Sequence, residues 1–139
     1  MTNTFTFELV SPERKLMSGP AKMVIIPGEE GDFGVLPGHS ALVASIRPGV
    51  VEVTMADSET PQRIFIAGGF ADVSPMNCTV LAEEAVNVTD LNQSDLEQTI
   101  RNLTEDMTMV KDELEKARLQ RKLVLARAKL QGVTGKAAA

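Results

Sequence analysis

The amino-acid sequence predicts an all-β domain followed by a pair of helices. All seven prolines and eight of the ten glycines lie within the first 75 residues, whereas residues 76–131 contain neither. This boundary separates a turn-rich half from a helix-permissive half. In the first half, short runs rich in Val, Ile and Phe alternate with turn signals roughly every ten residues, a pattern typical of a β-sandwich or a β-barrel.

The first half contains six apolar runs that we expect to be strands. The first, FTFELV at 5–10, alternates Phe5, Phe7 and Leu9 with side chains of the opposite face. This period of two predicts a strand that buries one face against a core. Five further runs follow it: MVII at 23–26, VVEVTM at 50–55, RIFIA at 63–67, FADV at 70–73 and CTVLA at 78–82.

The second half has the spacing of amphipathic helices. Ser94, with Glu97 three residues later, predicts a capping box at the helix start. One apolar stripe runs from Leu96 to Ala117, and a second stripe on another face runs from Leu119 to Leu130. Such stripes indicate packing against the chain's own body or against a second helix.

The continuity of this pattern leaves two arrangements open. A hairpin of two helices needs a break near Thr104–Thr108, but no Gly or Pro lies there. One long continuous helix is therefore also allowed. A helix that is able to fold down or to stand extended is a candidate switch.

Composition excludes several classes of function. The net charge of −5 and the absence of Trp and Tyr argue against nucleic-acid binding. No apolar run approaches the length of a membrane span, and the first 13 residues carry no Lys or Arg of a signal peptide. We therefore expect a protein that stays in the compartment where it is made. A single Cys78 fits a reducing cytosol and rules out an internal disulfide.

Catalytic and metal-binding patterns are not found. His39 is the only histidine, no G-x-S-x-G elbow exposes a serine, and one His with one Cys cannot build the usual zinc cage. The acids at 29, 30 and 32 lack the spacing of a calcium loop. The tail GVTGKA lacks the spacing of a phosphate-binding loop. We expect no catalytic residue, no metal and no cofactor, which favours an adaptor or a regulator over an enzyme.

Basic residues are concentrated in the second helical stretch. Between residues 116 and 129 there are six basic residues and no acidic one. The run is either a solvated helix face or a surface that docks onto an acidic partner. The six residues are Lys116, Arg118, Arg121, Lys122, Arg127 and Lys129.

Three long motifs carry a family resemblance. They are FELVSPERKLMSG at 7–19, EGDFGVLPGHSALVASIRPGVVEV at 30–53 and IFIAGGFADVSPMNCTVLAEEA at 64–85. With these motifs the chain resembles the epsilon subunits of bacterial F-type ATP synthases, the counterparts of the mitochondrial delta subunit. The resemblance implies an N-terminal β-sandwich of about ten strands at 1–88 and a C-terminal antiparallel two-helix hairpin, able to extend, at 89–135. It also implies a disordered tail at 136–139.

The resemblance further implies a non-catalytic subunit of the central stalk, or rotor, which couples rotation of the c-ring to ATP synthesis and is able to restrain ATP hydrolysis through its C-terminal helices. Such a subunit lies on the cytoplasmic face of the bacterial inner membrane without spanning it. Its partners are the gamma subunit, the c-ring and, through the helices, the alpha and beta subunits. The residues implied are Glu29, Glu30, Gly31, Asp32 and Phe33 for the c-ring; Pro37, Gly38, His39, Ser40, Ala41 and Leu42 for gamma; and Arg118, Arg121, Lys122 and Arg127 for alpha and beta.

One window departs from the family pattern. Members that bind ATP carry [IL]-D-x-x-R-[AS] at the start of the first helix, whereas this chain reads Leu91-Asn92-Gln93-Ser94-Asp95-Leu96. The acid has become an amide and the arginine an acid, which places a like charge where phosphate would lie. This argues against ATP binding. The alternative function is a free-standing module that senses nucleotide through its β-sandwich and helices.

Overall fold

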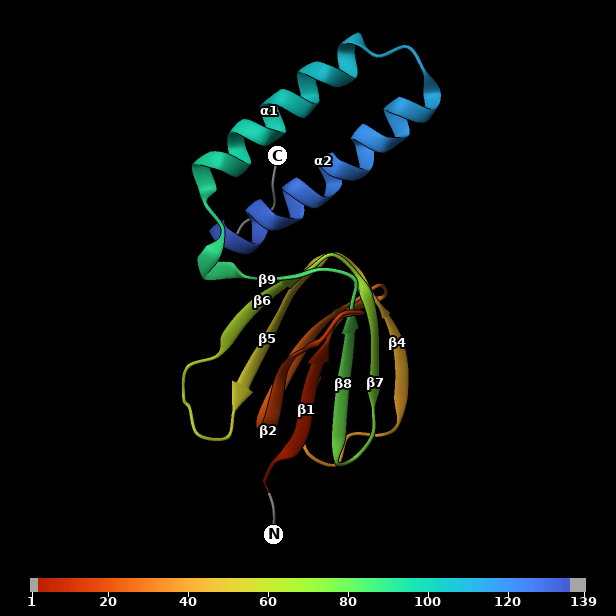
Figure 1. The fold of residues 1–139 in the computed structure, drawn as a ribbon. Helices are drawn as coiled ribbons and strands as arrows, with labels where there is room; N and C mark the ends of the chain where they lie inside the picture. Colours follow the sequence, from red (N-terminus) through yellow and green to blue (C-terminus); the bar gives the residue numbers. More distant parts are fainter. Residues whose placement is uncertain (1–2, 136–139) are drawn as a thin grey trace. The chain divides into compact units, whose positions relative to one another are not determined.

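The computed structural model describes residues 3–135, so the tail predicted at 136–139 lies outside the described residues. The chain divides between Asn87 and Val88 into two compact units, a β unit and a helical unit (Figure 1). The β unit contains β1 (Phe5–Val10), β2 (Lys15–Gly28), β3 (Gly31–Val35), β4 (Leu42–Ile46), β5 (Gly49–Met55), β6 (Gln62–Ile66), β7 (Gly69–Val73), β8 (Asn77–Ala82) and β9 (Ala85–Asn87). The helical unit contains a 3-10 turn η1 (Val88–Asp90), α1 (Gln93–Met109) and α2 (Glu113–Thr134).

The nine strands form a sandwich whose two layers are linked by the long strand β2. The strand order is β1-β8-β7-β4-β2-β5-β6-β9, with β3 also pairing with β2. The first part of β2 pairs with β1, and its last part pairs with β3, β4 and β5. Only the β1–β8 pair is parallel among the described strands. The predicted fold class is confirmed, with nine strands described where the resemblance implied about ten.

The alternating pattern of the first strand is also confirmed. Phe5, Phe7 and Leu9 are all buried, whereas Thr6 is exposed. The buried side chains of the other strands join them in a single core cluster that includes Ile26, Val53 and Ile66. Burying one such side chain contributes roughly 1.5–3 kcal/mol, and this core holds the sandwich together.

Helix α1 starts earlier than predicted. Asn92 is its N-cap, and the Asn92 side-chain oxygen accepts a hydrogen bond of 3.1 Å from the backbone N–H of Asp95. The predicted capping box of Ser94 and Glu97 is therefore wrong, since Ser94 already lies inside the first turn. The amide side chain of Asn92 satisfies one of the unpaired amides of the helix start.

The two helices form an antiparallel hairpin, one of the two arrangements that the sequence leaves open (Figure 1). A hairpin is expected from the sequence to need a break near Thr104–Thr108, but α1 continues through these residues to Met109, and both hydroxyls donate to backbone carbonyls within α1. The chain turns instead at Val110–Asp112, where Asp112 caps α2 by accepting from the N–H of Leu114. Helix α1 ends where its C-cap, Val110, adopts an extended backbone, and the carboxylate of Asp112 then caps the start of α2 without any Gly or Pro.

The second apolar stripe contains buried residues, whereas α1, which carries most of the first stripe, contains none. Leu119, Leu123 and Ala126 of α2 are buried. Leu114, at the far end of the first stripe, is 81% exposed because it follows the turn. None of the helices described between residues 3 and 135 is long and apolar enough to cross a membrane.

Candidate partner-binding surfaces

The acidic turn, Glu29–Gly31, joins β2 to β3 at one end of the β unit. Gly28 and Gly31 are paired in the β2–β3 ladder, so Glu29 and Glu30 form the tip and are exposed. The N–H of Glu29 donates to the carbonyl of Ser45 at 3.0 Å. The turn is thereby bonded to the end of β4 and presents two carboxylates to solvent in a defined position.

Asp32, predicted as a c-ring contact, has an ion-pair partner within the chain. Its Oδ1 lies 2.5 Å from Nη2 of Arg47, the residue that follows β4. The other terminal nitrogen of Arg47, Nη1, donates to the carbonyl of Gly28 at 2.5 Å. The structure therefore brings Asp32 beside the acidic turn, but its carboxylate is already engaged.

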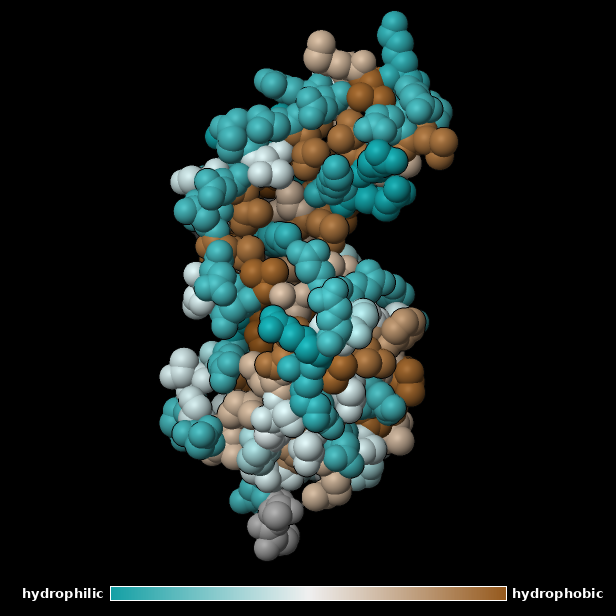
Figure 2. Space-filling view, viewed as in Figure 1, coloured by the Kyte–Doolittle hydropathy of each residue, from teal (hydrophilic) through white to brown (hydrophobic). Residues whose placement is uncertain are grey.

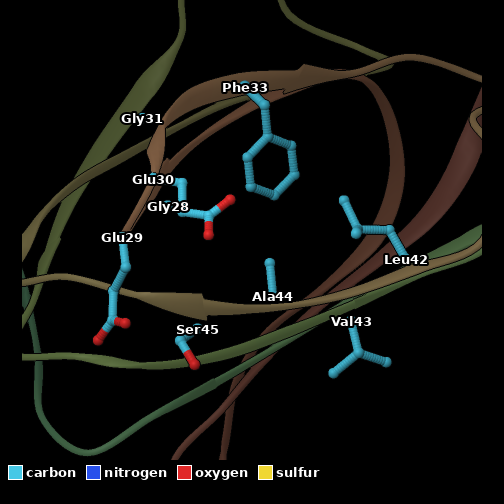
Figure 3. Close-up of a pocket in the computed structure, with 9 residues that line it drawn as sticks. All are labelled: Gly28, Glu29, Glu30, Gly31, Phe33, Leu42, Val43, Ala44 and Ser45. Carbon is cyan, nitrogen blue, oxygen red and sulfur yellow. The ribbon is translucent and has the colours of Figure 1, made fainter.

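A cavity of about 400 Å³ lies between the acidic turn and β4. Figure 3 shows the Phe33 ring and the Ala44 side chain facing this space, with the carboxylate of Glu30 beside it. Leu42 lies at the far side of the same space. The cavity combines an apolar floor with an acidic rim, which suits a side chain that has an aliphatic stem and a cationic head.

The segment Pro37–Leu42, predicted to face gamma, connects β3 to β4. The N–H of Gly38 donates to the carbonyl of Pro75 at 2.8 Å, which ties the segment to the β7–β8 turn. Nδ1 of His39 lies 2.7 Å from the carbonyl oxygen of Ser40, and the His39 ring centroid is 6.4 Å from that of Phe33. A carbonyl oxygen only accepts, so Nδ1 donates in this contact. His39 thus has a structural role between the two predicted contact segments.

Sequence reasoning missed an apolar surface on the outside of the sandwich. Phe70 and Leu81 lie directly opposite each other on β7 and β8, and Val10 of β1 is the next neighbour of Leu81. Val43 on β4 is 70% exposed, Phe70 is 55% exposed and Leu81 is 50% exposed. We call these four residues the outer apolar face. Apolar side chains are visible over β7 and β4 of the sandwich (Figure 2).

The outer apolar face has one signal in the sequence. In β7 and β8 every second residue points into the core, and these residues are Ala71, Val73, Cys78, Val80 and Ala82. If the other face of these strands were simply exposed to solvent, the residues between these inward ones would be polar. Phe70 and Leu81 occupy two of those outward positions. An apolar outward position marks either a covered face or a binding surface, and contiguous exposed apolar patches typically mark interaction sites.

The basic residues predicted to meet alpha and beta lie on α2. Arg118, Arg121 and Lys122 are exposed, and Arg118 forms an exposed ion pair of 3.6 Å with Glu115. Arg127 is half-buried, and its buried Nε has no hydrogen-bond partner among the described residues. The structure therefore places three of the four cations at the surface and the fourth partly within the unit.

The degenerate ATP window lies at the start of α1. Asn92 is occupied as the N-cap, with its side chain bonded to the backbone of Asp95. The carboxylate of Asp95 lies in the first turn, where the helix dipole favours a negative charge. Both departures from the family pattern therefore have a local structural role at this helix start.

Cys78 is buried in β8 as predicted, and its ionisation is suppressed. Burial, with a further contribution from the charge of Asp72, raises the pKa of the thiol to about 12. We expect the folded chain to resist a thiol-specific reagent at pH 8 and the urea-unfolded chain to react fully, because the thiolate is the nucleophile.

The raised pKa also predicts an alkaline loss of stability. The thiol of the unfolded chain ionises near its ordinary value, about 8.5. The contribution of Cys78 is therefore complete below that pH and is lost as pH rises towards about 12. Chemical unfolding between these pH values should show the free energy of unfolding falling more steeply with pH for the wild-type chain than for Cys78→Ala. Equal dependence on pH in the two proteins would contradict a raised pKa for Cys78.

A β-sandwich followed by a helical hairpin, with an acidic turn and an apolar face exposed on the sandwich, is typical of a protein that binds other chains. Comparison with known proteins makes the class specific. Residues 4–88 match the family model described as ATP synthase, Delta/Epsilon chain, beta-sandwich domain. Residues 92–139 match the model described as the C-terminal domain of the ATP synthase epsilon chain.

Curated relatives and solved structures agree with these models. The ATP synthase epsilon chain of Rhodospirillum centenum is 46% identical over 135 residues, covering 94% of this chain and 92% of the relative. That of Rhodospirillum rubrum is 40% identical, covering 97% of this chain and 100% of the relative. A chain in the Euglena gracilis mitochondrial ATP synthase, OSCP/F1/c-ring, superposes with a TM-score of 0.81 at 22% identity, covering 98% of this chain and 84% of that one, and shows the same fold.

The chain belongs to the ATP synthase epsilon chain family. By this family membership it is a subunit of the ATP synthase complex. The resemblance inferred from the three motifs is confirmed. The candidate contacts at 29–33 and 37–42 and on α2 stay predictions.

Proposed function

We propose that the chain is part of the central stalk and couples rotation of the c-ring to ATP synthesis by binding two partners through the β unit. The acidic turn binds the polar loops of the c-ring, and the outer apolar face, together with Pro37–Leu42, binds gamma. The observation that carries this proposal is the presence of both surfaces on one sandwich with a continuous core. A rigid body that binds two partners at once transmits force between them.

The character of each surface supports the assignment. The acidic turn exposes two carboxylates that attract a cationic loop, and such charges mainly raise the association rate and orient the partner. The outer apolar face supplies a desolvated contact, which is where most binding energy arises. The predicted gamma segment ends at Leu42, one residue before Val43 of the outer apolar face, although these two successive side chains point to opposite faces of β4.

The proposed location follows from these partners. A subunit that binds the c-ring and gamma lies beside the membrane on the side of the catalytic head. For a bacterial enzyme this is the cytoplasmic face of the inner membrane.

Neutralising the tip of the acidic turn tests the c-ring contact. We expect the double variant Glu29→Gln/Glu30→Gln to bind purified c-ring about tenfold more weakly, because two attractive charges are lost. The loss should shrink as salt concentration rises, since salt screens exposed charges. Binding of the labelled protein to detergent-solubilised c-ring measures the effect.

The matched control is another adjacent acidic pair, changed as Glu83→Gln/Glu84→Gln. It alters net charge equally and lies between β8 and β9, three strands across the sheet from β2 and its acidic turn. Equal weakening by the two double variants would show a general charge effect and would remove the role proposed for Glu29 and Glu30.

We also propose that the helical unit restrains ATP hydrolysis through the basic face of α2. Arg118, Arg121 and Lys122 are exposed there and suit an acidic surface of alpha and beta. Removing residues 89–139 is expected to raise ATP hydrolysis by the assembled complex about fivefold, the lower range of typical coupling between sites, and to leave proton-driven synthesis near the wild-type rate.

A second variant tests whether the positive charges of α2, rather than the presence of the helix, restrain hydrolysis. Arg118→Gln/Arg121→Gln/Lys122→Gln keeps α2 and removes three exposed cations. Hydrolysis should rise in this variant as well. Unchanged hydrolysis after truncation would exclude a restraining role for the helical unit.

A further inference from the structure

We propose that Arg47 is a positioning residue that holds the acidic turn in its binding shape, and that Asp32 acts through Arg47 rather than on the partner. The inference rests on the proposed contact between the acidic turn and the c-ring. Arg47 contacts both flanks of the turn: Nη1 donates to the carbonyl of Gly28 before it, and Nη2 donates to the carboxylate of Asp32 after it. One guanidinium thus closes the base of the turn, and we call this arrangement the latch.

Arg47 is itself fixed by the backbone around it. Its N–H donates to the carbonyl of Pro27 at 3.0 Å, and Pro48 follows it directly. Proline restricts its own backbone and the conformation of the residue before it. The side chain therefore starts from a constrained position. A planar guanidinium can donate to two acceptors at once in a fixed geometry, which a lysine ammonium does less well.

The latch changes which carboxylates are available to a partner. Asp32 is paired with Arg47 within the chain, so its carboxylate is less available to a partner than an unpaired one. Among the described residues, no ion pair is recorded for Glu29 or Glu30, and both are exposed at the tip. The carboxylates of Glu29 and Glu30 at the tip carry the charge that attracts a cation. The Asp32–Arg47 pair fixes the position of the turn that bears them.

The latch reaches the cavity beside the turn through Gly28, which lines the cavity and whose carbonyl accepts from Arg47. The cavity is bounded by Gly28, Glu29 and Glu30 on one side and by β4 on the other (Figure 3). Arg47 links the base of the turn to the end of β4 through Asp32 and Gly28. Loss of the latch would free the turn to move relative to β4 and change the shape of this cavity.

A double-mutant cycle on the full-length protein tests the proposal. The variants are Arg47→Gln, Asp32→Asn and the two combined. In the free protein, each single variant should raise hydrogen exchange of the Glu29 amide, which donates to Ser45, by about threefold to tenfold, as expected for an exposed pair. The combined variant should raise it no further, because both changes break the same contact.

Binding to purified c-ring is the second measurement. We expect each single variant to weaken binding by about threefold to tenfold and the combined variant to weaken it equally. Arg47→Lys should recover part of the affinity. Arg63→Gln is the matched control, since Arg63 pairs with Glu52 at 3.2 Å on β5 and β6, and it should change neither measurement.

The outcomes separate the latch from the proposed function. A further loss of binding when Asp32→Asn is added to Arg47→Gln would show that Asp32 meets the c-ring directly and would overturn the proposal. Unchanged exchange of the Glu29 amide in the single variants would also overturn it. A wild-type protein that does not bind c-ring, with exchange altered as expected, would refute the proposed function and leave the latch standing.

Discussion

Replacing Gly69 with alanine is expected to destabilise the β unit by about 4 kcal/mol or more. Gly69 opens β7, where it pairs with Ile46 on one side and Ala82 on the other. A Cβ at this position would lie 1.9 Å from the carbonyl oxygen of Leu81 and 2.9 Å from its carbonyl carbon. Both atoms belong to the backbone of a paired strand and have no side-chain rotamer through which to move away.

The backbone conformation adds to this steric cost. Gly69 has a φ of +150°, which residues with a Cβ rarely adopt. The β7–β8 ladder would have to separate locally, and β4 pairs with the other edge of β7. Urea unfolding followed by circular dichroism should show a midpoint far below wild type or a protein that does not fold.

Gly38 provides the matched control for this prediction. It also has a positive φ, +88°, but a Cβ there would meet nothing within 4 Å. Gly38→Ala should therefore cost only the backbone strain, about 1–2 kcal/mol. Equal destabilisation by the two variants would show that strain, rather than the close approach of Leu81, makes glycine necessary at Gly69.

Local patterns predicted those parts of the fold that depend on local chemistry. The alternation of Phe5, Phe7 and Leu9 indicates a strand because burial on one face selects a period of two. The helix boundaries were less predictable, because several capping side chains compete within a few residues. Asn92 with Asp95 precedes Ser94 with Glu97, and the structure uses the earlier cap.

The position of the turn between the helices was hard to predict for the same reason, because local signals compete there. The absence of Gly and Pro left both a hairpin and one continuous helix open, whereas the protein starts α2 with Asp112 as a cap, with Glu115 three residues later in the spacing of a capping box. That signal is present in the sequence. It competes with the helical spacing of Leu114 and Ala117, which continues the first stripe across the turn, and packing of α2 against α1 decides between them.

The candidate surfaces depend on pairings that are distant in the sequence. Asp32 and Arg47 are 15 residues apart, and no spacing rule joins them until β2, β3 and β4 are paired. The outer apolar face depends on the register that sets Phe70 opposite Leu81. The motifs at 30–53 and 64–85 indicate that these segments matter, but not which side chains face outward.

Phe70→Glu is expected to weaken binding to purified gamma by about thirtyfold or more, which corresponds to at least about 2 kcal/mol. In the proposed complex the Phe70 ring lies at the centre of the outer apolar face, beside Leu81. The substitution removes an aromatic contact and buries an unpaired carboxylate. Burying a charge without a partner is costly. Isothermal titration calorimetry with gamma measures the loss.

The fold should survive this substitution, which makes the binding result interpretable. Phe70 points away from the core, since its neighbour Ala71 is buried and Phe70 itself is 55% exposed. The cost to stability should stay near 1 kcal/mol, roughly the usual range for exposed strand positions. Val124→Glu adds the same charge at a 46% exposed apolar position on α2 and should leave gamma binding unchanged. If Phe70→Glu binds gamma as tightly as wild type, the outer apolar face is not the gamma surface, and the contact must be sought elsewhere on the sandwich.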